Sequence, residues 1–190
     1  MAAADLHGRR VLVTQAAAFM GPALCEMLAE CGGDVVADER PLADPAAPEM
    51  LVRGAGRIDA LVANLALPAP STPAGEVSDD EWRHVFDHLV HPLPRLLRAV
   101  LPQMQERGRG KILVMGSASA LRGMKRASTY SAARGAQLAW VQAVGVELAP
   151  AGIQVNAIAQ NFVDNPTYFP PEVQANPRFQ ERLRREVPLG

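Results

Sequence analysis

RVLVTQAAAFMG, residues 10–21, is the stretch that decides the fold of this chain. Its first five residues form a short apolar run rich in β-branched side chains, which is typical of a buried parallel strand. Apolar side chains then recur at helical spacing over residues 20–31, and Gly32-Gly33 ends that helix. A second β-branched run follows at 34–38. A strand, a helix and a strand in this order predict a parallel pair joined by a right-handed crossover.

The rest of the chain repeats this alternation. We expect strands over 58–64, 111–115 and 153–158, and helices over 47–54, 78–107, 129–149 and 175–186. Pro92 and Pro94 should disturb the second of these helices, and Ser78 and Glu81 should cap its start reciprocally. The pattern predicts an α/β fold, with a Rossmann-like doubly wound parallel sheet and helices on both faces. Residues 1–190 should form a single domain whose site lies beyond the carboxyl ends of the strands.

Composition excludes several classes of function. Hydrophobic residues make up 48% of the chain and charged residues 21%, with a net charge of -1. These values are ordinary for a globular protein and give no basic surface for nucleic acid. Cys25 and Cys31 do not form a CxxC pair, and no apolar run is long enough to span a membrane. With no leader-like segment at the N-terminus, we expect a cytoplasmic protein.

The order of elements resembles the short-chain dehydrogenase/reductase superfamily over nearly the whole chain, but the first turn departs from that pattern. The superfamily carries T-G-x-x-x-G-x-G after its first strand, whereas this sequence has TQAAAFMG at residues 14–21 and keeps only Gly21. The glycines let the backbone approach a pyrophosphate. Gln15 and Phe19 put side chains into that space, and the ring of Phe19 would stand where a nicotinamide nucleotide should lie. We therefore expect no cofactor.

The adenosine-binding half of the fold also looks shortened. Only 19 residues, 39–57, separate the second strand from the third, which is too little chain for the further strand and helix of a full nucleotide-binding half. Asp38 is a signal in the opposite direction, because dinucleotide folds place a ribose-binding acid at this strand end. Without the glycine turn, an ordinary loop carboxylate is the preferred interpretation.

Ser117, Tyr130 and Arg134 form the strongest catalytic pattern. Tyr130 and Arg134 are four residues apart on a predicted helix, so they share a face. A guanidinium that close favours the phenolate, which makes Tyr130 usable as a general base near neutral pH. Ser117 follows the strand 111–115, and its hydroxyl can both donate to and accept from a substrate oxygen.

The spacings Thr14-x4-Phe19-x-Gly21 and Ser117-x12-Tyr130-x3-Arg134 together resemble the halohydrin dehalogenases, a cofactor-independent branch of that superfamily, and are most similar to its B-type subgroup. The resemblance implies a lyase that expels halide from a vicinal haloalcohol and leaves an epoxide, with reverse opening of epoxides by small anions. It implies a homotetramer and a halide and substrate pocket. The residues of that pocket would be Phe19, Gln160, Asn161, Phe162, Val163, Tyr168 and Phe169.

Other interpretations stay open at this stage. An NAD(P)-dependent reductase with a degenerate turn is one alternative, and a non-catalytic Rossmann-like binding module is another. His84, His88 and His91 recur on one helical face, but no carboxylate or thiolate accompanies them, so we expect partly exposed histidines and no metal site. Relatives continue beyond a Pro-Leu-Gly similar to residues 188–190, so we expect a C-terminal strand to be missing from this sequence.

Overall fold

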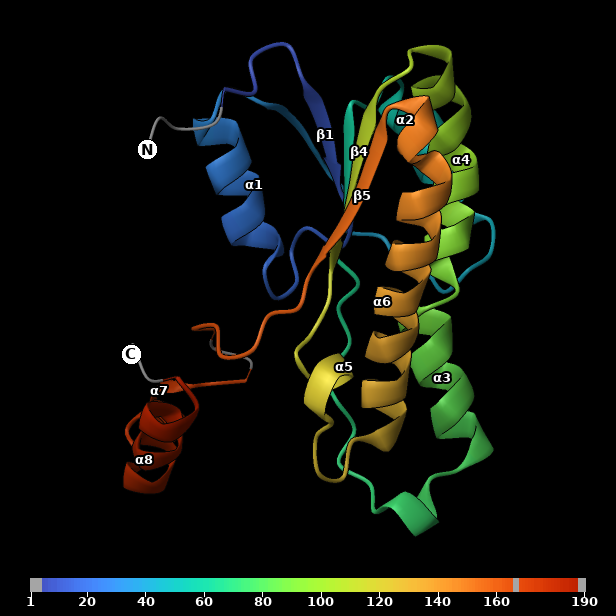
Figure 1. Ribbon diagram of the computed structural model, residues 1–190. Helices are drawn as coiled ribbons and strands as arrows, with labels where there is room; N and C mark the ends of the chain where they lie inside the picture. The colour runs from blue at the N-terminus through green and yellow to red at the C-terminus, as the bar shows by residue number, and fades with distance from the viewer. Residues whose placement is uncertain (1–4, 166–167, 188–190) are drawn as a thin grey trace.

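Five parallel strands form the centre of the computed structural model, which describes residues 5–165 and 168–187 (Figure 1). They are β1 (Arg10–Val13), β2 (Asp34–Ala37), β3 (Ala60–Ala63), β4 (Gly110–Met115) and β5 (Ile153–Ile158). Their order across the sheet is β2-β1-β3-β4-β5, and every neighbouring pair is parallel. The predicted sheet is confirmed.

Helices cover both faces of the sheet, as expected. On one face lies α1 (Gly21–Glu30); on the other lie α2 (Ala47–Ala55), α3 (Asp79–Leu89), α4 (Pro92–Glu106) and α6 (Ser128–Leu148) (Figure 1). Beyond the carboxyl ends of β4 and β5 come the short helix α5 (Ser119–Arg122), α7 (Pro171–Gln174) and α8 (Pro177–Glu186). Two 3-10 turns span Ala74–Glu76 and Ala149–Ala151. In the described part of the chain, no helix is long and apolar enough to cross a membrane.

The continuous apolar runs of the strands contribute side chains to two hydrophobic cores, one on each face of the sheet. Val11 and Val13 of β1 pack with α1, whereas Leu12 between them packs with the helices of the opposite face. Ile112 and Leu113 of β4 divide in the same way. Alternate side chains of a strand point to opposite faces, so a strand covered on both sides must be apolar at every position. Full burial of a side chain such as Leu12 contributes about 1.5–3 kcal/mol to folding.

The helix expected over 78–107 is two helices, which meet at the predicted proline disturbance. Pro92 starts α4 in the first helical turn, where its missing amide costs no hydrogen bond. Ser78 caps α3 as expected, because its Oγ accepts from the Glu81 amide at 3.1 Å. The reciprocal bond, in which the Glu81 carboxylate would accept from the Ser78 amide, is not formed, so that part of the prediction is wrong. The Glu81 carboxylate instead accepts from the hydroxyls of Thr72 at 2.6 Å and Thr129 at 2.8 Å, and so ties α3 to the start of α6.

Two local differences bear on the site. The crossover from β2 to β3 contains α2 as its helix and no additional strand, so β2 pairs only with β1 in the described sheet. This agrees with the predicted shortening of the adenosine half. The segment 116–127, between the predicted strand 111–115 and helix 129–149, contains α5, which the sequence did not predict. A four-residue helix is a single turn, and it leaves no periodic apolar signal in the sequence.

Candidate active site

The predicted site residues meet at the carboxyl end of the sheet, around a cavity of about 770 Å³. Ser117 reaches it from the end of β4, Tyr130 from the first turn of α6, and Phe19 from the turn after β1. The segment that follows β5 supplies the remaining predicted residues, namely Gln160, Asn161, Phe162, Val163, Tyr168 and Phe169. Arg134 does not line this cavity and lies behind Tyr130, against a smaller cavity of about 30 Å³. The structure therefore brings the whole predicted set together, with Arg134 in a supporting layer.

Tyr130 and Arg134 are both buried, with 7% and 5% of their surface exposed. The guanidinium carbon of Arg134 lies 4.9 Å from the centre of the Tyr130 ring, so the cation stacks over the ring. Its Nη1 donates to the Met115 carbonyl at 2.9 Å, and its Nη2 donates to the Leu65 carbonyl at 3.1 Å. Met115 is the last residue of β4, and Leu65 lies just after β3, so the sheet itself holds the cation beside the phenol. The charge of Arg134 is therefore fixed against the face of the Tyr130 ring.

Gln137 completes this layer one helical turn further along α6. It is fully buried; its Oε1 accepts from Arg134 at 3.0 Å, and its Nε2 donates to the Leu89 carbonyl at 2.6 Å. The side-chain amide of Gln137 thus bridges the guanidinium to the end of α3 and fixes its orientation.

Ser117 lies directly beyond β4, where the pairing of β4 with β5 continues past both strands. The Gly116 amide donates to Ile158 at 2.8 Å, and the Ala118 amide donates to Gln160 at 2.7 Å. Ser117 Oγ accepts from the Ser119 amide at 3.2 Å and lies 3.0 Å from Ser119 Oγ. With the Ser119 groups as donors, the Ser117 hydroxyl keeps its own proton for an oxygen atom in the cavity.

The turn after β1 keeps a glycine-type backbone although it has lost two glycines. Gln15 and Phe19 have φ values of 45° and 49°, a left-handed conformation that costs a non-glycine residue roughly 1–2 kcal/mol. Asn64 holds the turn, since its Nδ2 donates at 3.0 Å to the carbonyls of Gln15 and Ala18. Gly21 cannot be replaced without movement, because a Cβ there would lie 2.3 Å from the Ala16 carbonyl oxygen.

The side chains added at this turn fill space that the glycines would leave open. Gln15 Oε1 accepts from the Ala66 amide, which joins the turn to the segment after β3. The ring of Phe19 packs on that of Tyr168, with 5.1 Å between their centres. The Tyr168 hydroxyl accepts from the Ala69 amide at 3.2 Å and donates to the Leu67 carbonyl at 3.3 Å. Phe19 and Tyr168 therefore close the path from the turn to Tyr130.

A nicotinamide dinucleotide, which the resemblance to the reductases would imply, does not fit these residues. Phe19 and Tyr168 occupy the approach to Tyr130, and the cavity beside Arg134 has room for only about two water molecules. Asp38, the candidate ribose ligand, has its carboxylate engaged by Arg40, through the backbone amide at 3.0 Å and the guanidinium at 2.8 Å. This is the ordinary loop carboxylate that we preferred.

The loop after β5 offers donors for an anion. Within the described residues, the backbone amides of Asn161, Phe162 and Val163 have no acceptor. The Phe162 ring lies 5.6 Å from that of Phe169 and 6.0 Å from that of Phe179, so an aromatic cluster supports the loop. Backbone amides in series and aromatic ring edges both suit a large, weakly hydrated anion.

Tyr168 is the second phenol of the site, and it stays neutral. Burial raises the pKa of Tyr168 to about 12, and repulsion by Tyr130 and a hydrogen bond between the two phenols act in the same direction. A phenol with so high a pKa donates hydrogen bonds at neutral pH and does not act as a base. Of the two tyrosines in the cavity, Tyr130 is therefore the candidate base.

Several residues of the site carried no signal in the sequence. Ser119, Arg122, Arg182 and Glu186 also line the large cavity, and Gln137 supports Arg134. Ser119 and Arg122 lie in the four-residue helix α5, which no motif or period marks, whereas Arg182 and Glu186 lie in α8, a predicted helix whose position beside the cavity the sequence did not give. His84 is exposed and His88 half-buried on α3, with their rings 4.2 Å apart, and His91, which follows α3, is exposed and pairs with Asp87 at 2.8 Å. No metal-binding cluster of three or more His, Cys, Asp or Glu side chains occurs in the described residues.

Relatives in sequence mostly carry the names of oxidoreductases. A protein named as a ketoacyl reductase of the monensin polyketide synthase of Streptomyces virginiae is 35% identical over 113 residues, which are 58% of this chain and 43% of that protein. The chain thus spans less than half of that relative's length. A 3-oxoacyl-[acyl-carrier-protein] reductase of Vibrio harveyi is 26% identical over 84% of this chain and 75% of its own.

Solved structures of both kinds share the fold. A structure described as a dehalogenation enzyme superposes with a TM-score of 0.86 and 31% identity, over 100% of this chain and 85% of that one. A gluconate 5-dehydrogenase of Burkholderia cenocepacia in complex with NADP and tartrate also has a TM-score of 0.86, at 23% identity, over 98% and 83%. The second likeness concerns the fold alone.

The profile of the family described as enoyl-(acyl carrier protein) reductase matches residues 3–190. With the parallel sheet, the serine at the end of β4 and the tyrosine on α6, this match places the whole described structure within one family. The chain belongs to that family, within the short-chain dehydrogenase/reductase superfamily.

Proposed function

We propose that the protein is a halohydrin dehalogenase, which converts a vicinal haloalcohol to an epoxide and halide without a nucleotide. The observation that carries the proposal is Phe19, which takes a glycine position of the turn and packs on Tyr168 in front of the Tyr130 and Arg134 pair. The likeness to the dehalogenation enzyme at 31% identity supports it. The reaction needs a base and an anion site, and neither of these requires a dinucleotide.

In the proposed reaction, Ser117 and Tyr130 hold the hydroxyl of the substrate. The Ser117 proton is available for the substrate oxygen because Ser119 supplies the donors to Ser117 Oγ. Tyr130, with the Arg134 cation stacked over its ring, removes the hydroxyl proton as the general base. The alkoxide then forms a bond to the neighbouring carbon, and the carbon–halogen bond breaks with its electron pair on the halide. The proton passes from Tyr130 to solvent through the large cavity.

The departing halide would lie against the loop after β5. The amides of residues 161–163, which have no acceptor among residues 5–165 and 168–187, are donors beside the cavity, and the rings of Phe19 and Phe162 also line it. Gln160 is engaged through its carbonyl, so it contributes to this site chiefly by fixing the loop. In the reverse direction the same groups would hold a small anion that opens an epoxide. The tetramer implied by the resemblance stays a prediction, which sedimentation of the purified protein would check.

An NAD(P)-dependent reductase is the second candidate, because the relatives matched in sequence carry oxidoreductase names. Gln15 and Phe19 oppose it, as does the absence of open space beside Arg134. A reductase would need the turn to rearrange by several ångströms before a nicotinamide could approach Tyr130. This rearrangement is the point at which the two functions make different predictions.

The test is release of chloride from 1,3-dichloro-2-propanol by purified protein, without added nucleotide. We expect turnover by the native protein and a loss of roughly 10²–10⁴-fold in the Tyr130→Phe variant, which is the usual contribution of a general base. Melting temperature should confirm that the variant stays folded. In parallel, NADH and NADPH are titrated by fluorescence, with a ketoacyl substrate as the partner reaction.

Chloride release that is unaffected by Tyr130→Phe, or no release from a folded protein, would refute the dehalogenase. Nucleotide binding with ketone reduction would establish the second candidate instead.

A further inference from the structure

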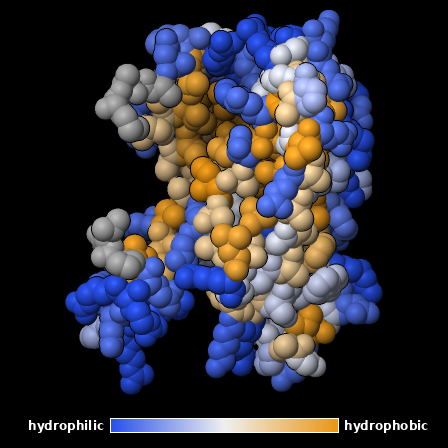
Figure 2. Space-filling view, viewed as in Figure 1, coloured by the Kyte–Doolittle hydropathy of each residue, from blue (hydrophilic) through white to orange (hydrophobic). Residues whose placement is uncertain are grey.

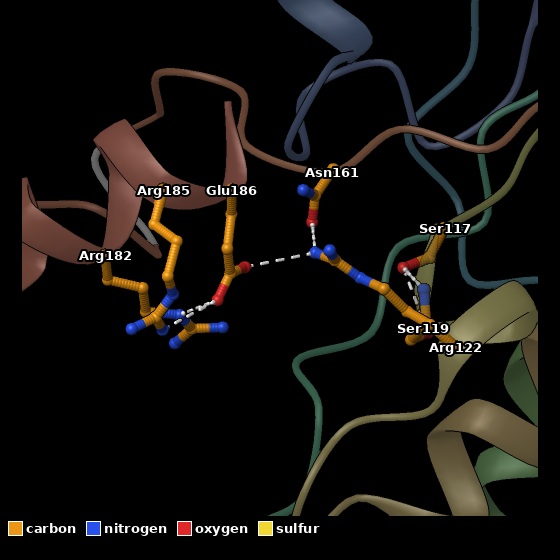
Figure 3. A network of polar contacts seen from close by, with 7 residues as sticks. All are labelled: Ser117, Ser119, Arg122, Asn161, Arg182, Arg185 and Glu186. Atoms are coloured by element: carbon orange, nitrogen blue, oxygen red, sulfur yellow. Dashed lines mark hydrogen bonds and ion pairs between the residues drawn. The ribbon is translucent and has the colours of Figure 1, made fainter. Parts of the chain in front are cut away.

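The end of the large cavity away from Phe19 is cationic. Among the described residues that line it, Arg122, Lys125 and Arg182 carry positive charge, and Glu186 is the acidic one. Figure 3 shows the Arg122 side chain extending from the short helix beside Ser117 towards Asn161 and Glu186. The lower left of the molecule, where α7 and α8 lie, is strongly hydrophilic in Figure 2. A halide leaving group has its own donors in the loop after β5, so these cations are not needed to hold it.

Within the described part of the chain, Arg122 is held by hydrogen bonds from only one of its guanidinium nitrogens, Nη2. It ends α5, whose first residue is the partner of Ser117, so its backbone is about 4.5 Å along the helix axis from Ser119. Its Nη2 donates to Asn161 Oδ1 at 2.7 Å and to Glu186 Oε2 at 3.4 Å. A guanidinium has five N–H donors, and within the described residues the donors on Nε and Nη1 of Arg122 have no acceptor.

Glu186 already shows that this place attracts a carboxylate. Its oxygens lie 2.9 Å from Arg182, 3.4 Å from Arg122 and 3.7 Å from Arg185. The hydrogen bond from Arg182, and then the charges of Arg182, Arg122 and Arg185, hold the pKa of Glu186 below its usual value. One carboxylate among three guanidiniums leaves an excess of positive charge. Lys125, which has no acidic partner in the described part of the chain, adds to that excess.

We propose that Arg122 and Lys125 form a subsite for a carboxylate carried by the substrate, so that the enzyme acts on haloalcohols and epoxides of short-chain carboxylic acids. This rests on the proposed dehalogenase function and specifies its substrate class. A cavity of about 770 Å³ is large for a three-carbon haloalcohol. Ala69, Pro70 and Met124 line it with apolar atoms that suit the carbon chain between the two ends.

The simplest substrate of this class is 4-chloro-3-hydroxybutanoate. Tyr130 takes the proton of the C3 hydroxyl, the oxygen forms a bond to C4, and the C4–Cl bond breaks with its electron pair on chloride. The products are 3,4-epoxybutanoate, chloride and one proton, and the carboxylate is unchanged throughout. Its matched neutral analogue is 4-chloro-3-hydroxybutanamide, which has nearly the same shape and lacks the charge.

The first experiment compares the two compounds by chloride release at low ionic strength. We expect kcat/KM for the carboxylate to exceed that for the amide by about tenfold or more, mostly through KM, as for a charged hydrogen bond. Arg122→Gln should bring the ratio close to one, and added salt should reduce it in the native enzyme. Arg178→Gln is the matched control, since Arg178 is an exposed arginine of α8 outside the cavity, and it should keep the native ratio.

The second experiment needs no turnover. Calorimetry measures binding of 3-hydroxybutanoate and 3-hydroxybutanamide, which lack a leaving group. Tighter binding of the acid, lost in Arg122→Gln but kept in Arg178→Gln, supports the subsite even if neither chloro compound reacts; that result would refute only the dehalogenase. Equal binding of acid and amide, or a preference that survives Arg122→Gln, overturns the subsite, whether or not chloride is released.

Discussion

The turn after β1 and the first turns of α6 occupy neighbouring places at the carboxyl end of the sheet, yet they have diverged to different degrees from the superfamily pattern. The turn keeps a glycine-type backbone at Gln15 and Phe19 but fills its open space with their side chains. The α6 segment carries Tyr130 with Arg134 stacked over its ring, an arrangement that can serve proton transfer without a nucleotide. The backbone of a binding loop can thus be retained while the ligand space is lost, because side chains and not the chain path decide what fits.

The difference extends to how each region is supported. Arg134 donates to the carbonyl of Met115 at the end of β4, to that of Leu65 just after β3, and to Gln137, so the sheet fixes the proton-transfer end. Phe19 is supported by Tyr168, which comes from the segment after β5. Variants in α6 should therefore mainly lower the stability of the whole fold. Variants in the turn after β1 should mainly change which ligand binds.

The largest effect should come from Arg134→Met. Two backbone carbonyls and the Gln137 oxygen would lose their donor inside the protein, for a loss of about 3–5 kcal/mol in the free energy of unfolding. Urea unfolding measures this. Arg53→Met is the matched control, because Arg53 forms an exposed pair with Glu49 on α2 and should cost less than about 1 kcal/mol. Equal stability of the two variants would show that α6 is not anchored through its arginine.

Gly21→Ala should come next. The new Cβ would lie 2.3 Å from the Ala16 carbonyl oxygen, so the turn or α1 must shift, at a cost of about 1–3 kcal/mol. Gly54→Ala on α2 is the control: its Cβ meets nothing within 4 Å, and it should stabilise the helix by about 0.5–1 kcal/mol. Thermal melting should show a lower melting temperature for Gly21→Ala and a higher one for Gly54→Ala. Such opposite shifts would show that Gly21, unlike the replaced glycines of the turn, is required by the close approach of the backbone.

Phe19→Gly combined with Gln15→Gly should change function more than stability. Relief of two left-handed residues, roughly 1–2 kcal/mol each, offsets the lost packing on Tyr168 and the lost bond to Ala66. Chloride release should fall by roughly tenfold as the halide side of the cavity loosens. NADPH, titrated by fluorescence, should bind the double variant more tightly than the native protein. Unchanged nucleotide affinity would mean that other parts of the shortened fold exclude it.

The smallest effect is a pH dependence at Tyr168. Because its pKa in the folded protein is about 12, the unfolded chain loses this proton near pH 10 while the folded protein keeps it. The contribution of protonated Tyr168 to the free energy of unfolding is therefore fully present below pH 10 and is lost as the pH rises towards 12. Urea midpoints at pH 9 and pH 11 should fall more in the native protein than in Tyr168→Phe. Parallel pH dependence of the two proteins would contradict the buried setting of this phenol.

Much of the fold followed from patterns of short range. The β-branched runs predicted all five strands, and the prolines at 92 and 94 predicted the break between α3 and α4. The turn at residues 14–21 and the spacing of Ser117 and Tyr130 predicted three residues that line the large cavity, Phe19, Ser117 and Tyr130. Each of these signals is periodic or local, so the chain expresses it without reference to distant partners. The residues expected at the large cavity from the loop after β5 came from the resemblance to the dehalogenases. The predicted capping bond of Glu81 was wrong because a local pattern carries no information on distant partners. Its carboxylate accepts instead from the hydroxyls of Thr72 and Thr129, and Thr129 lies 48 residues away.

By itself, the sequence determined the parallel sheet, the departure from a dinucleotide turn, and the tyrosine and arginine on one helical face. Only the tertiary structure decided that Arg134 stacks over the ring, that Gln137 holds it, and that Arg122 meets Glu186 at the far end of the cavity. The physical reason is that secondary structure depends on the period of side chains along the chain. A buried cation, in contrast, takes whichever carbonyls and carboxylates the folded backbone brings within hydrogen-bonding distance, and these come from elements far apart in the sequence.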